Sequence, residues 1–147
     1  TLATYTGTHV PLIKVIEGSN PLRHCSEEGR GMPLNAAAPA KILIAYMPDK
    51  LRARFLRAVT FERYTKDTIT DMPSYLKELE QARIDGYALC KNELTPYCLA
   101  ISVPIFKKTG EVLFALTAVG YIERISQVFD EILERLRAAA REIEAVL

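Results

Sequence analysis

Three cysteines and two histidines are the residues of this chain that could act as nucleophiles, bases or metal ligands: Cys25, Cys90, Cys98, His9 and His24. A catalytic cysteine needs a base beside it, and a zinc site needs ligands in closely spaced pairs. No CxxC or HExxH spacing occurs, so a zinc site built from His24, Cys25 and another cysteine is a minor alternative. The sequence favours surface or strand-edge histidines and a half-buried thiol at Cys90, while a nucleophilic Cys90 stays open as an alternative.

Other catalytic signatures are missing as well, since the chain contains no Walker loop, GxGxxG or GxSxG motif. We therefore predict neither an enzyme nor a bound cofactor. The 19 Lys and Arg residues against 18 Asp and Glu residues leave a net charge of +1, which is too balanced for a nucleic-acid-binding domain.

The odd number of cysteines favours the reducing cytoplasm. No apolar run approaches the ~18 residues of a membrane span, and the first ten residues lack the pattern of a signal peptide. We expect a soluble, cytoplasmic protein. The chain starts with Thr1 instead of Met, as an excised piece of a longer protein would.

A run of small residues offers a second kind of chemistry, the binding of an anion at the start of a helix. In Ala36-Ala-Ala-Pro-Ala-Lys41, the proline suits a first helical turn, because its missing N–H would have no partner there. The free N–H groups of such a turn attract negative charge, and the alanines would let a ligand approach. An ordinary helix start would have the same residues, so this run alone does not distinguish an anion-binding site from an ordinary helix start.

The elements that must position these residues begin with strands. Residues 10–18 mix β-branched residues with partial alternation, and hairpin partners are expected in 2–6 and 22–26. Two further strands, 98–106 and 112–119, are expected to be central in the sheet. Residues 107–110 would join them in a hairpin turn in which Gly110 supplies a positive φ.

Helices are expected over 39–47, 50–59 and 73–86, the last one with a polar N-terminal cap and a glycine stop. A fourth helix of about 25 residues is expected from 122 to 147, with one apolar face against the sheet or a partner. The chain length of 147 residues favours one domain. Strands joined by short turns, followed by helices, predict an α+β fold with an antiparallel sheet.

Several fragments together resemble, in order and spacing, the effector-binding domain of IclR-type transcription regulators. They are Gly29-Arg-Gly-Met-Pro-Leu-Asn35, Ala38-Pro-Ala-Lys-Ile-Leu-Ile-Ala45, Thr68-Ile-Thr-Asp71, Leu79-Glu-Gln-Ala-Arg-Ile-Asp-Gly-Tyr-Ala88, Glu93, Val103-Pro-Ile-Phe106 and Ala115-Leu-Thr-Ala-Val-Gly120. The resemblance implies a GAF-like α+β sensor domain over residues 1–147, with a long C-terminal helix. It also implies that a winged helix-turn-helix, absent from this chain, contacts DNA, and that the protein forms a homodimer or homotetramer.

In family members that sense small keto acids, the resemblance implies that backbone N–H groups at a helix start, an Asp, a Cys and two Ser hold the carboxylate. The matching positions here are Ala38 and Pro39 at the helix start, Cys90 for the Asp, Ala100 for the Cys, and Thr117 and Val119 for the two Ser. Met32 and Cys98 are expected to face the same cavity. Up to four polar partners are therefore lost.

This loss predicts the kind of effector. A buried carboxylate without donors costs several kcal/mol, so glyoxylate should bind poorly, whereas an apolar body gains ~25 cal/mol per Å² removed from water. We expect a small organic acid with an apolar or aromatic part, anchored by Thr117 and the N–H groups of Ala40 and Lys41. The alternatives are a cysteine-dependent enzyme using Cys90 and a ligand-free dimerisation module.

Overall fold

The computed structural model describes residues 1–147 and contains one five-stranded sheet in the order β2-β1-β5-β4-β3. All four neighbouring pairs of strands are antiparallel. The strands are β1 Leu2–Ala3, β2 Leu12–Lys14, β3 Ala88–Lys91, β4 Cys98–Phe106 and β5 Val112–Tyr121. With five helices in addition, the predicted α+β fold with an antiparallel sheet is confirmed.

The β4–β5 hairpin is the longest pairing in the sheet and was predicted from its turn. The Lys107 N–H donates to the Glu111 carbonyl oxygen at 2.8 Å, and Gly110 adopts φ +85° as expected. β5 continues to Tyr121, two residues beyond the predicted end, because it stays paired with β4 up to Cys98. The two strands occupy the interior of the sheet, as predicted.

The N-terminal strands differ from the prediction. Only 12–14 of the expected strand 10–18 is regular, and no strand forms over 22–26. The partner expected in 2–6 is confirmed, because β1 pairs with β2. On the other side the segment contacts 29–32 instead of 22–26: the Leu12 N–H donates to the Arg30 carbonyl oxygen at 3.0 Å, and the Met32 N–H donates to the Val10 carbonyl oxygen at 2.8 Å. Residues 15–26 leave the sheet as an excursion whose side chains are mostly exposed.

Five helices complete the fold: α1 Ala38–Tyr46, α2 Asp49–Ala58, α3 Met72–Asp85, α4 Ile122–Gln127 and α5 Phe129–Ala145. The first three match the predicted helices. α3 has the expected cap, because the Asp71 side chain accepts a hydrogen bond from the Ser74 N–H at 2.8 Å. It ends at Gly86, whose φ of +76° places it in the left-handed region that suits glycine.

The single C-terminal helix predicted for residues 122–147 is wrong. The helix breaks at Val128, where φ −127° and ψ 28° are not helical, and this gives the short α4 and the long α5. The break lets Ile125 and Phe129 both pack against the apolar cluster on one face of β4. No helix of the structure combines the length and the apolar character needed to cross a membrane.

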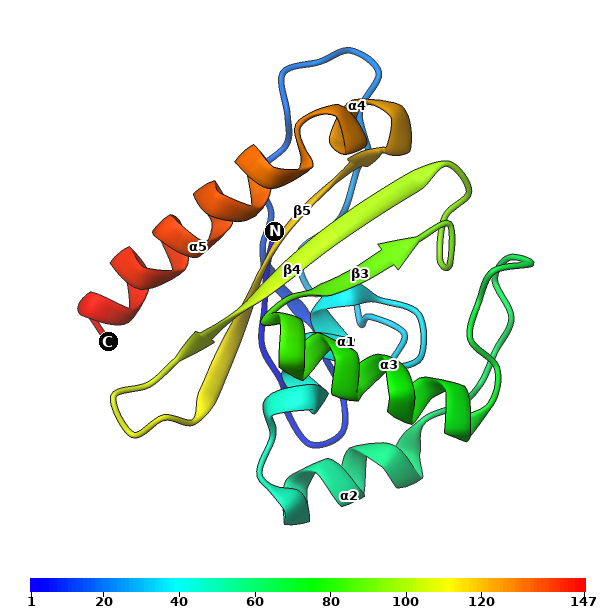
Figure 1. The fold of residues 1–147 in the computed structure, drawn as a ribbon, viewed down its shortest axis with the longest axis vertical. Helices are drawn as coiled ribbons and strands as arrows, with labels where there is room; N and C mark the ends of the chain where they lie inside the picture. The colour runs from blue at the N-terminus through cyan, green and yellow to red at the C-terminus, as the bar shows by residue number, and fades with distance from the viewer.

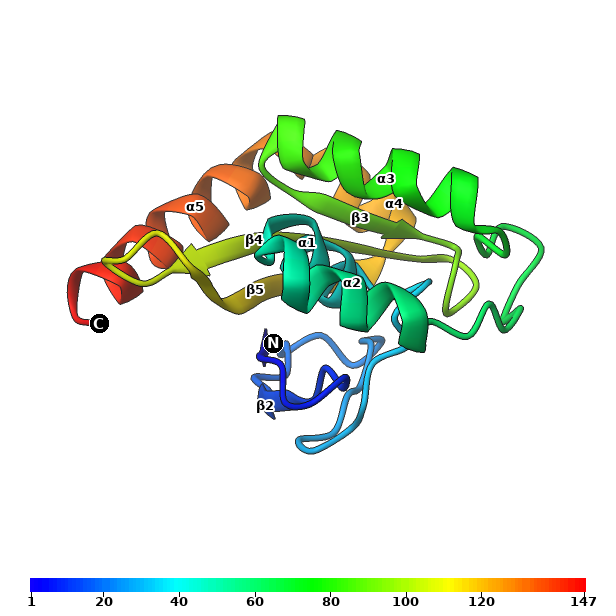
Figure 2. The ribbon, with the colours of Figure 1, turned by 90° about the horizontal axis from the view of Figure 1, so that it is seen from below.

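Two apolar clusters cover the two faces of the sheet. Leu99, Ile101, Val103 and Ile105 of β4 pack against α5, while α1 packs in the larger cluster with β1, β2 and α3. Figure 1 shows α5 running beside β4 and β5, with α2 at the far end of the molecule. Figure 2 shows α5 above these strands and the N-terminal segment below them.

Candidate functional site

A cavity lies between the start of α1 and the face of the sheet formed by β3, β4 and β5. It has a volume of about 40 Å³ and is lined by 15 residues, which we call the cavity residues. All eight residues predicted for the site are among them: Met32, Ala38, Pro39, Cys90, Cys98, Ala100, Thr117 and Val119. The structure therefore brings together every residue of the predicted site around one hollow.

The register of the sheet explains why these residues meet. Cys90 of β3 pairs with Ala100 of β4, which pairs with Val119 of β5, so the three side chains form one row across the strands. Ala38 of α1 packs on Cys90 and Ala100 of this row. Alternate residues of a strand share a face, which places Cys98 and Thr117 on the same side.

A pair of hydroxyl groups lies in the next row. Ser102 of β4 pairs directly with Thr117 of β5, and their side-chain oxygens are 2.9 Å apart. Ser102 is fully buried, and only Thr117 lines the cavity. A hydroxyl has one donor and two acceptor positions, so Thr117 keeps capacity for a further hydrogen bond.

The start of α1 supplies fewer donors than a usual helix. Ala37 precedes the helix in an extended conformation, no side chain caps it, and Pro39 has no N–H. The expectation that the Lys41 N–H is free is wrong, because it donates to the Ala37 carbonyl oxygen at 3.1 Å. The N–H groups of Ala38 and Ala40 have no acceptor in the protein, and both residues are fully buried. Only Ala38 lines the cavity, so the expected anchor at the Ala40 N–H is not part of its wall.

A buried ion cluster fixes the segment that follows β3. Lys41 is fully buried, and its Nζ lies 2.6 Å from Glu93 Oε2 and 3.2 Å from Glu78 Oε1. Burial raises the pKa of the Glu93 carboxyl, and Lys41 opposes this rise. The Thr68 hydroxyl donates to the Glu93 carbonyl oxygen at 2.6 Å. These contacts position the neighbouring Leu94 and Thr95, which line the cavity.

The Cys90 thiol is buried, and no side chain forms a hydrogen bond with it. Burial, and next the negative charge of Glu93, raise the pKa of Cys90 to about 11. A thiol with such a pKa is protonated at neutral pH and is a poor nucleophile. Burial therefore leaves Cys90 without the activation that a nucleophilic cysteine has.

The structure places His24 deeper than the predicted surface or strand-edge position, although part of its side chain stays open to solvent. It lines the cavity half-buried, and its Nδ1 is 3.8 Å from Cys98 Sγ. Its neighbour Cys25 is exposed. The structure contains no group of three or more His, Cys, Asp or Glu side chains that could hold a metal ion, so His24, Cys25 and another cysteine do not form the zinc site weighed from the sequence.

A wider hollow of about 370 Å³, which we call the groove, adjoins the cavity. The two spaces share Thr1, His24, Ser26, Thr117 and Val119 in their walls. A water molecule needs about 10–15 Å³ of such space, so the cavity alone holds only a few waters. The groove alone exceeds the ~300 Å³ at which small-molecule sites begin, whereas the cavity is far below that size.

Sequence reasoning missed several residues of the site. Leu12, Ser26, Leu94 and Thr95 line the cavity from loops or from the sheet edge, and Ser102 lies behind Thr117. Strand alternation could have found Ser102, which is two residues from Ala100 on the same face of β4. No local pattern indicates where the loop residues lie.

Comparison with known proteins identifies the family. The family model described as bacterial transcriptional regulator IclR C-terminal matches residues 1–145. This chain belongs to the IclR family. The resemblance predicted from the sequence is thus confirmed, and the known relatives of this IclR domain are transcription regulators.

One curated relative is the HTH-type transcriptional repressor AllR of Escherichia coli strain K12, with 29% identity over 147 residues. The match covers 99% of the IclR domain described here and 54% of AllR. The chain spans about half the length of the curated relatives it matches.

Solved structures agree with the fold. An IclR transcriptional regulator from Alicyclobacillus acidocaldarius superposes with a TM-score of 0.87 at 26% identity, covering 98% of this IclR domain and 58% of that chain. The inducer-binding domain of the PobR transcription factor from Acinetobacter, in a double-mutant complex with 3-hydroxybenzoic acid, gives a TM-score of 0.83. Its identity is 23%, with 99% of this IclR domain and 87% of that chain covered, which establishes the shared fold alone.

Proposed function

We propose that this IclR domain senses a small organic acid with an apolar or aromatic part and thereby modulates DNA binding by a separate domain of a longer regulator. The observation that carries the proposal is the lining of the cavity, in which 9 of 15 residues are hydrophobic. Burying a Phe-sized group there would contribute about 1.5–3 kcal/mol to binding. The aromatic acid named with the PobR domain supports this class of ligand.

The polar groups of the cavity determine which acids can bind in addition to its apolar lining. The free N–H group of Ala38 is a neutral donor, and so is the Thr117 hydroxyl when Ser102 donates to it, while Val119 and Ala100 add none. A small acid enclosed by these groups would leave charge uncompensated, at a cost of several kcal/mol. We therefore infer weak binding of glyoxylate and pyruvate and stronger binding of acids that bury a larger apolar body.

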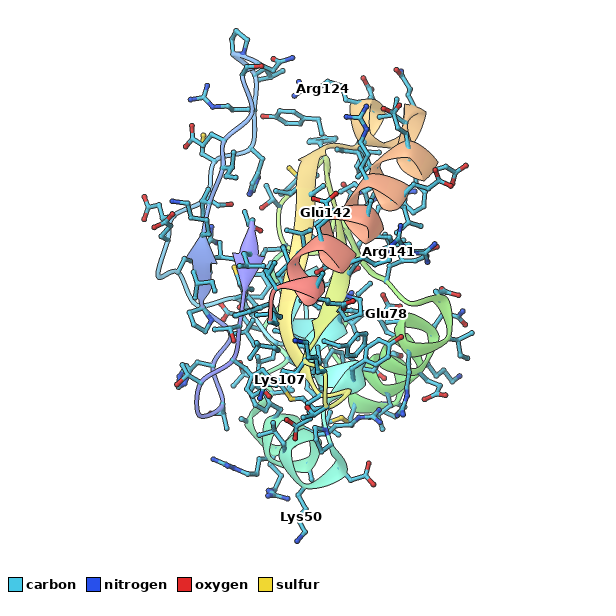
Figure 3. All side chains as sticks on the ribbon, turned by 90° about the vertical axis from the view of Figure 1, so that its left-hand side faces the viewer. Lys50, Glu78, Lys107, Arg124, Arg141 and Glu142 are labelled. Carbon is cyan, nitrogen blue, oxygen red and sulfur yellow. The ribbon has the colours of Figure 1, made fainter.

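The small cavity implies that the effector displaces part of its wall. Residues 15–26 form the outer wall of the groove, and the Arg124 guanidinium of α4 donates to the Leu22 carbonyl oxygen in this excursion. Figure 3 shows Arg124 where the excursion and α4 come together. An effector that lifts the excursion would bias the arrangement of the domain, and only its difference in affinity between the two arrangements can change DNA binding.

The remaining features of the proposal concern the whole protein. The domain acts without catalysis, which the protonated Cys90 thiol supports. The DNA-binding domain lies on the same polypeptide outside residues 1–147, which the half-length match to AllR supports. We place the regulator in the cytoplasm, where its DNA is, as a homodimer or homotetramer.

A thermal-shift screen of residues 1–147 tests the proposal, because a ligand that binds only the folded state raises the melting temperature. The panel pairs acids that share a carboxylate and differ in apolar size, such as acetate with phenylacetate. We expect a rise that grows with apolar size. Ala100→Leu, which fills the cavity, should abolish the rise, while Ala58→Leu on the exposed part of α2 should keep it. No rise with any acid would contradict the sensor and favour a dimerisation module.

A further inference from the structure

One cavity residue differs from all the others in the charge it can carry. Of the side chains that line the cavity, only His24 can become positive, because the rest are Thr, Leu, Ser, Met, Ala, Pro, Cys and Val. His24 also lines the groove, so it lies where the two spaces meet. Among the cavity side chains His24 is thus the one that can offer an acid a counter-charge, and it lies at the mouth, where the only other cationic group of the cavity lining, the Thr1 amino group, already donates to the Thr117 carbonyl oxygen.

We infer that His24 binds the carboxylate of the effector at the mouth of the cavity, with the apolar part of the effector pointing inward. The inference rests on the proposed function and assigns the orientation of the ligand and the residue that selects for an acid. This orientation differs from the one that the family resemblance implies, in which the helix start holds the carboxylate. Two donors are missing from the helix start, because Pro39 has no N–H and the Lys41 N–H already donates to the Ala37 carbonyl oxygen. The helix start is therefore a weaker carboxylate site here than the resemblance implies.

The imidazole has one nitrogen available for this contact. Nδ1 faces Cys98 Sγ at 3.8 Å, whereas Nε2 has no hydrogen-bond partner in the protein and is not sealed from solvent. A protonated imidazole donates from both nitrogens. Nε2 can therefore donate a charge-assisted hydrogen bond to a carboxylate at the mouth, and the Ser26 hydroxyl in the same wall is a second donor.

The depth of the cavity fits the apolar end of such a ligand. The cavity residues that the groove does not share are Leu12, Met32, Ala37, Ala38, Pro39, Cys90, Leu94, Thr95, Cys98 and Ala100. Thr95 is the only hydroxyl among them, and none of these side chains is charged at neutral pH. A carboxylate has better partners at the mouth than among these side chains.

Ionisable groups surround His24 on several elements. Cys98 on β4 contacts His24, and Arg30 in the N-terminal segment acts on its pKa. The other ionisable groups line the same groove as His24: Tyr121 at the end of β5, Arg124 on α4, and Glu17 and Arg23 in the N-terminal segment. Arg23 and Glu17 form an ion pair of 2.8 Å and largely cancel each other. Burial raises the pKa of the Cys98 thiol, which stays neutral. The Thr1 amino group donates to the Thr117 carbonyl oxygen at 2.7 Å.

These surroundings make the contact dependent on pH. Burial, and next the positive charge of Arg30, lower the pKa of His24 in the ligand-free protein. A bound carboxylate favours the imidazolium and raises the pKa of His24 in the complex. Between the two pKa values binding takes up a proton, so affinity for an acid falls as the pH rises from the pKa of the ligand-free protein to the pKa of the complex.

Benzoate and its neutral isostere benzamide are the probes, with their affinities measured by calorimetry between about pH 5.5 and 8. For the wild-type domain we expect benzoate to bind at least about tenfold more tightly than benzamide near pH 6, with uptake of a proton. The His24→Gln variant should lose both the preference and the proton uptake. The matched control His9→Gln, on the exposed second histidine, should keep both.

Three results would overturn the inference: equal binding of benzoate and benzamide by the wild type, unchanged preference in His24→Gln, or no binding of either probe. None of these results decides whether the domain senses an organic acid, because the thermal-shift screen of the acid panel tests that proposal. The role of His24 and the proposed function can therefore fail separately. If His24→Gln does not fold, an NMR titration of the wild-type domain with benzoate still tests the inference through the Cε1 proton resonance of the His24 imidazole. Benzoate should shift it toward the imidazolium position, and an unmoved resonance contradicts the inference.

Discussion

The side-chain oxygens of Ser102 and Thr117 lie 2.9 Å apart on directly paired positions of β4 and β5. Both residues are buried, so this bond fixes the Thr117 hydroxyl at the edge of the cavity and leaves it with capacity for a hydrogen bond to a ligand. The row beside it, Cys90, Ala100 and Val119, has no hydroxyl. The specificity for the effector therefore depends on two adjacent rows of the sheet, one with hydroxyl groups and one without.

Val119→Ser should move the specificity toward small polar acids. The added hydroxyl lies on the cavity wall beside Thr117 and can donate to a carboxylate, which is worth about 1–1.5 kcal/mol or about a tenfold gain. Calorimetric affinities for glyoxylate and phenylacetate measure the change. The control is Val146→Ser, where the same substitution is exposed at the end of the chain. An unchanged ratio of the two affinities in Val119→Ser would count against the wall position of residue 119.

Lys41→Met should destabilise the fold strongly. It leaves the Glu93 carboxylate buried without the ammonium group 2.6 Å away, and such changes cost about 3–5 kcal/mol. Urea unfolding gives the free energy of unfolding, and Lys77→Met on the exposed side of α3 is the control. Adding Glu93→Gln to Lys41→Met should recover part of the loss, because it removes the unpaired charge. A loss below about 1 kcal/mol would show that the cluster is not buried as described.

The three thiols should differ sharply in their reaction with a disulfide reagent such as Ellman's reagent. Cys25 is exposed, whereas Cys90 and Cys98 are buried and burial raises the pKa of both thiols. One thiol should therefore react fast, and two should react only as the protein unfolds. Cys25→Ser should remove the fast phase. A fast reaction at Cys90 would instead revive the nucleophile considered from the sequence.

His24 should make the ligand-free domain less stable in mild acid. Its lowered pKa in the folded state means that the unfolded chain binds more protons below its ordinary pKa of about 6.5. The contribution to stability is present above that pH and is lost as the pH falls through the folded-state pKa. Urea unfolding at several pH values should show this component in His9→Gln but not in His24→Gln. If the pH-dependent component of stability is also present in His24→Gln, it comes from another residue than His24.

The elements predicted correctly are those with local signals. Asp71 and Gly86 mark the ends of α3, and Gly110 marks the turn of the β4–β5 hairpin. The missed strand β3 has only four residues, and it is a strand because it pairs with residues 99–102 of β4. The break at Val128 was missed because the apolar spacing continues across it from Ile125 to Phe129.

The site shows the same division between local and long-range information. The positions on β3, β4 and β5 were placed by resemblance, and the register of the sheet unites them in two rows. His24 was misplaced because its contact with Cys98 spans 74 residues of sequence and depends on the path of the 15–26 excursion. No periodicity or motif in that excursion encodes its path.

The central claim is that the cavity selects for an apolar body on the acid. Its most direct test is the ratio of the dissociation constants of pyruvate and phenylpyruvate for residues 1–147, measured by calorimetry, since the two acids differ by one phenyl group. Burial of that group predicts at least about tenfold tighter binding of phenylpyruvate. Equal affinities, or tighter binding of pyruvate, would contradict the account.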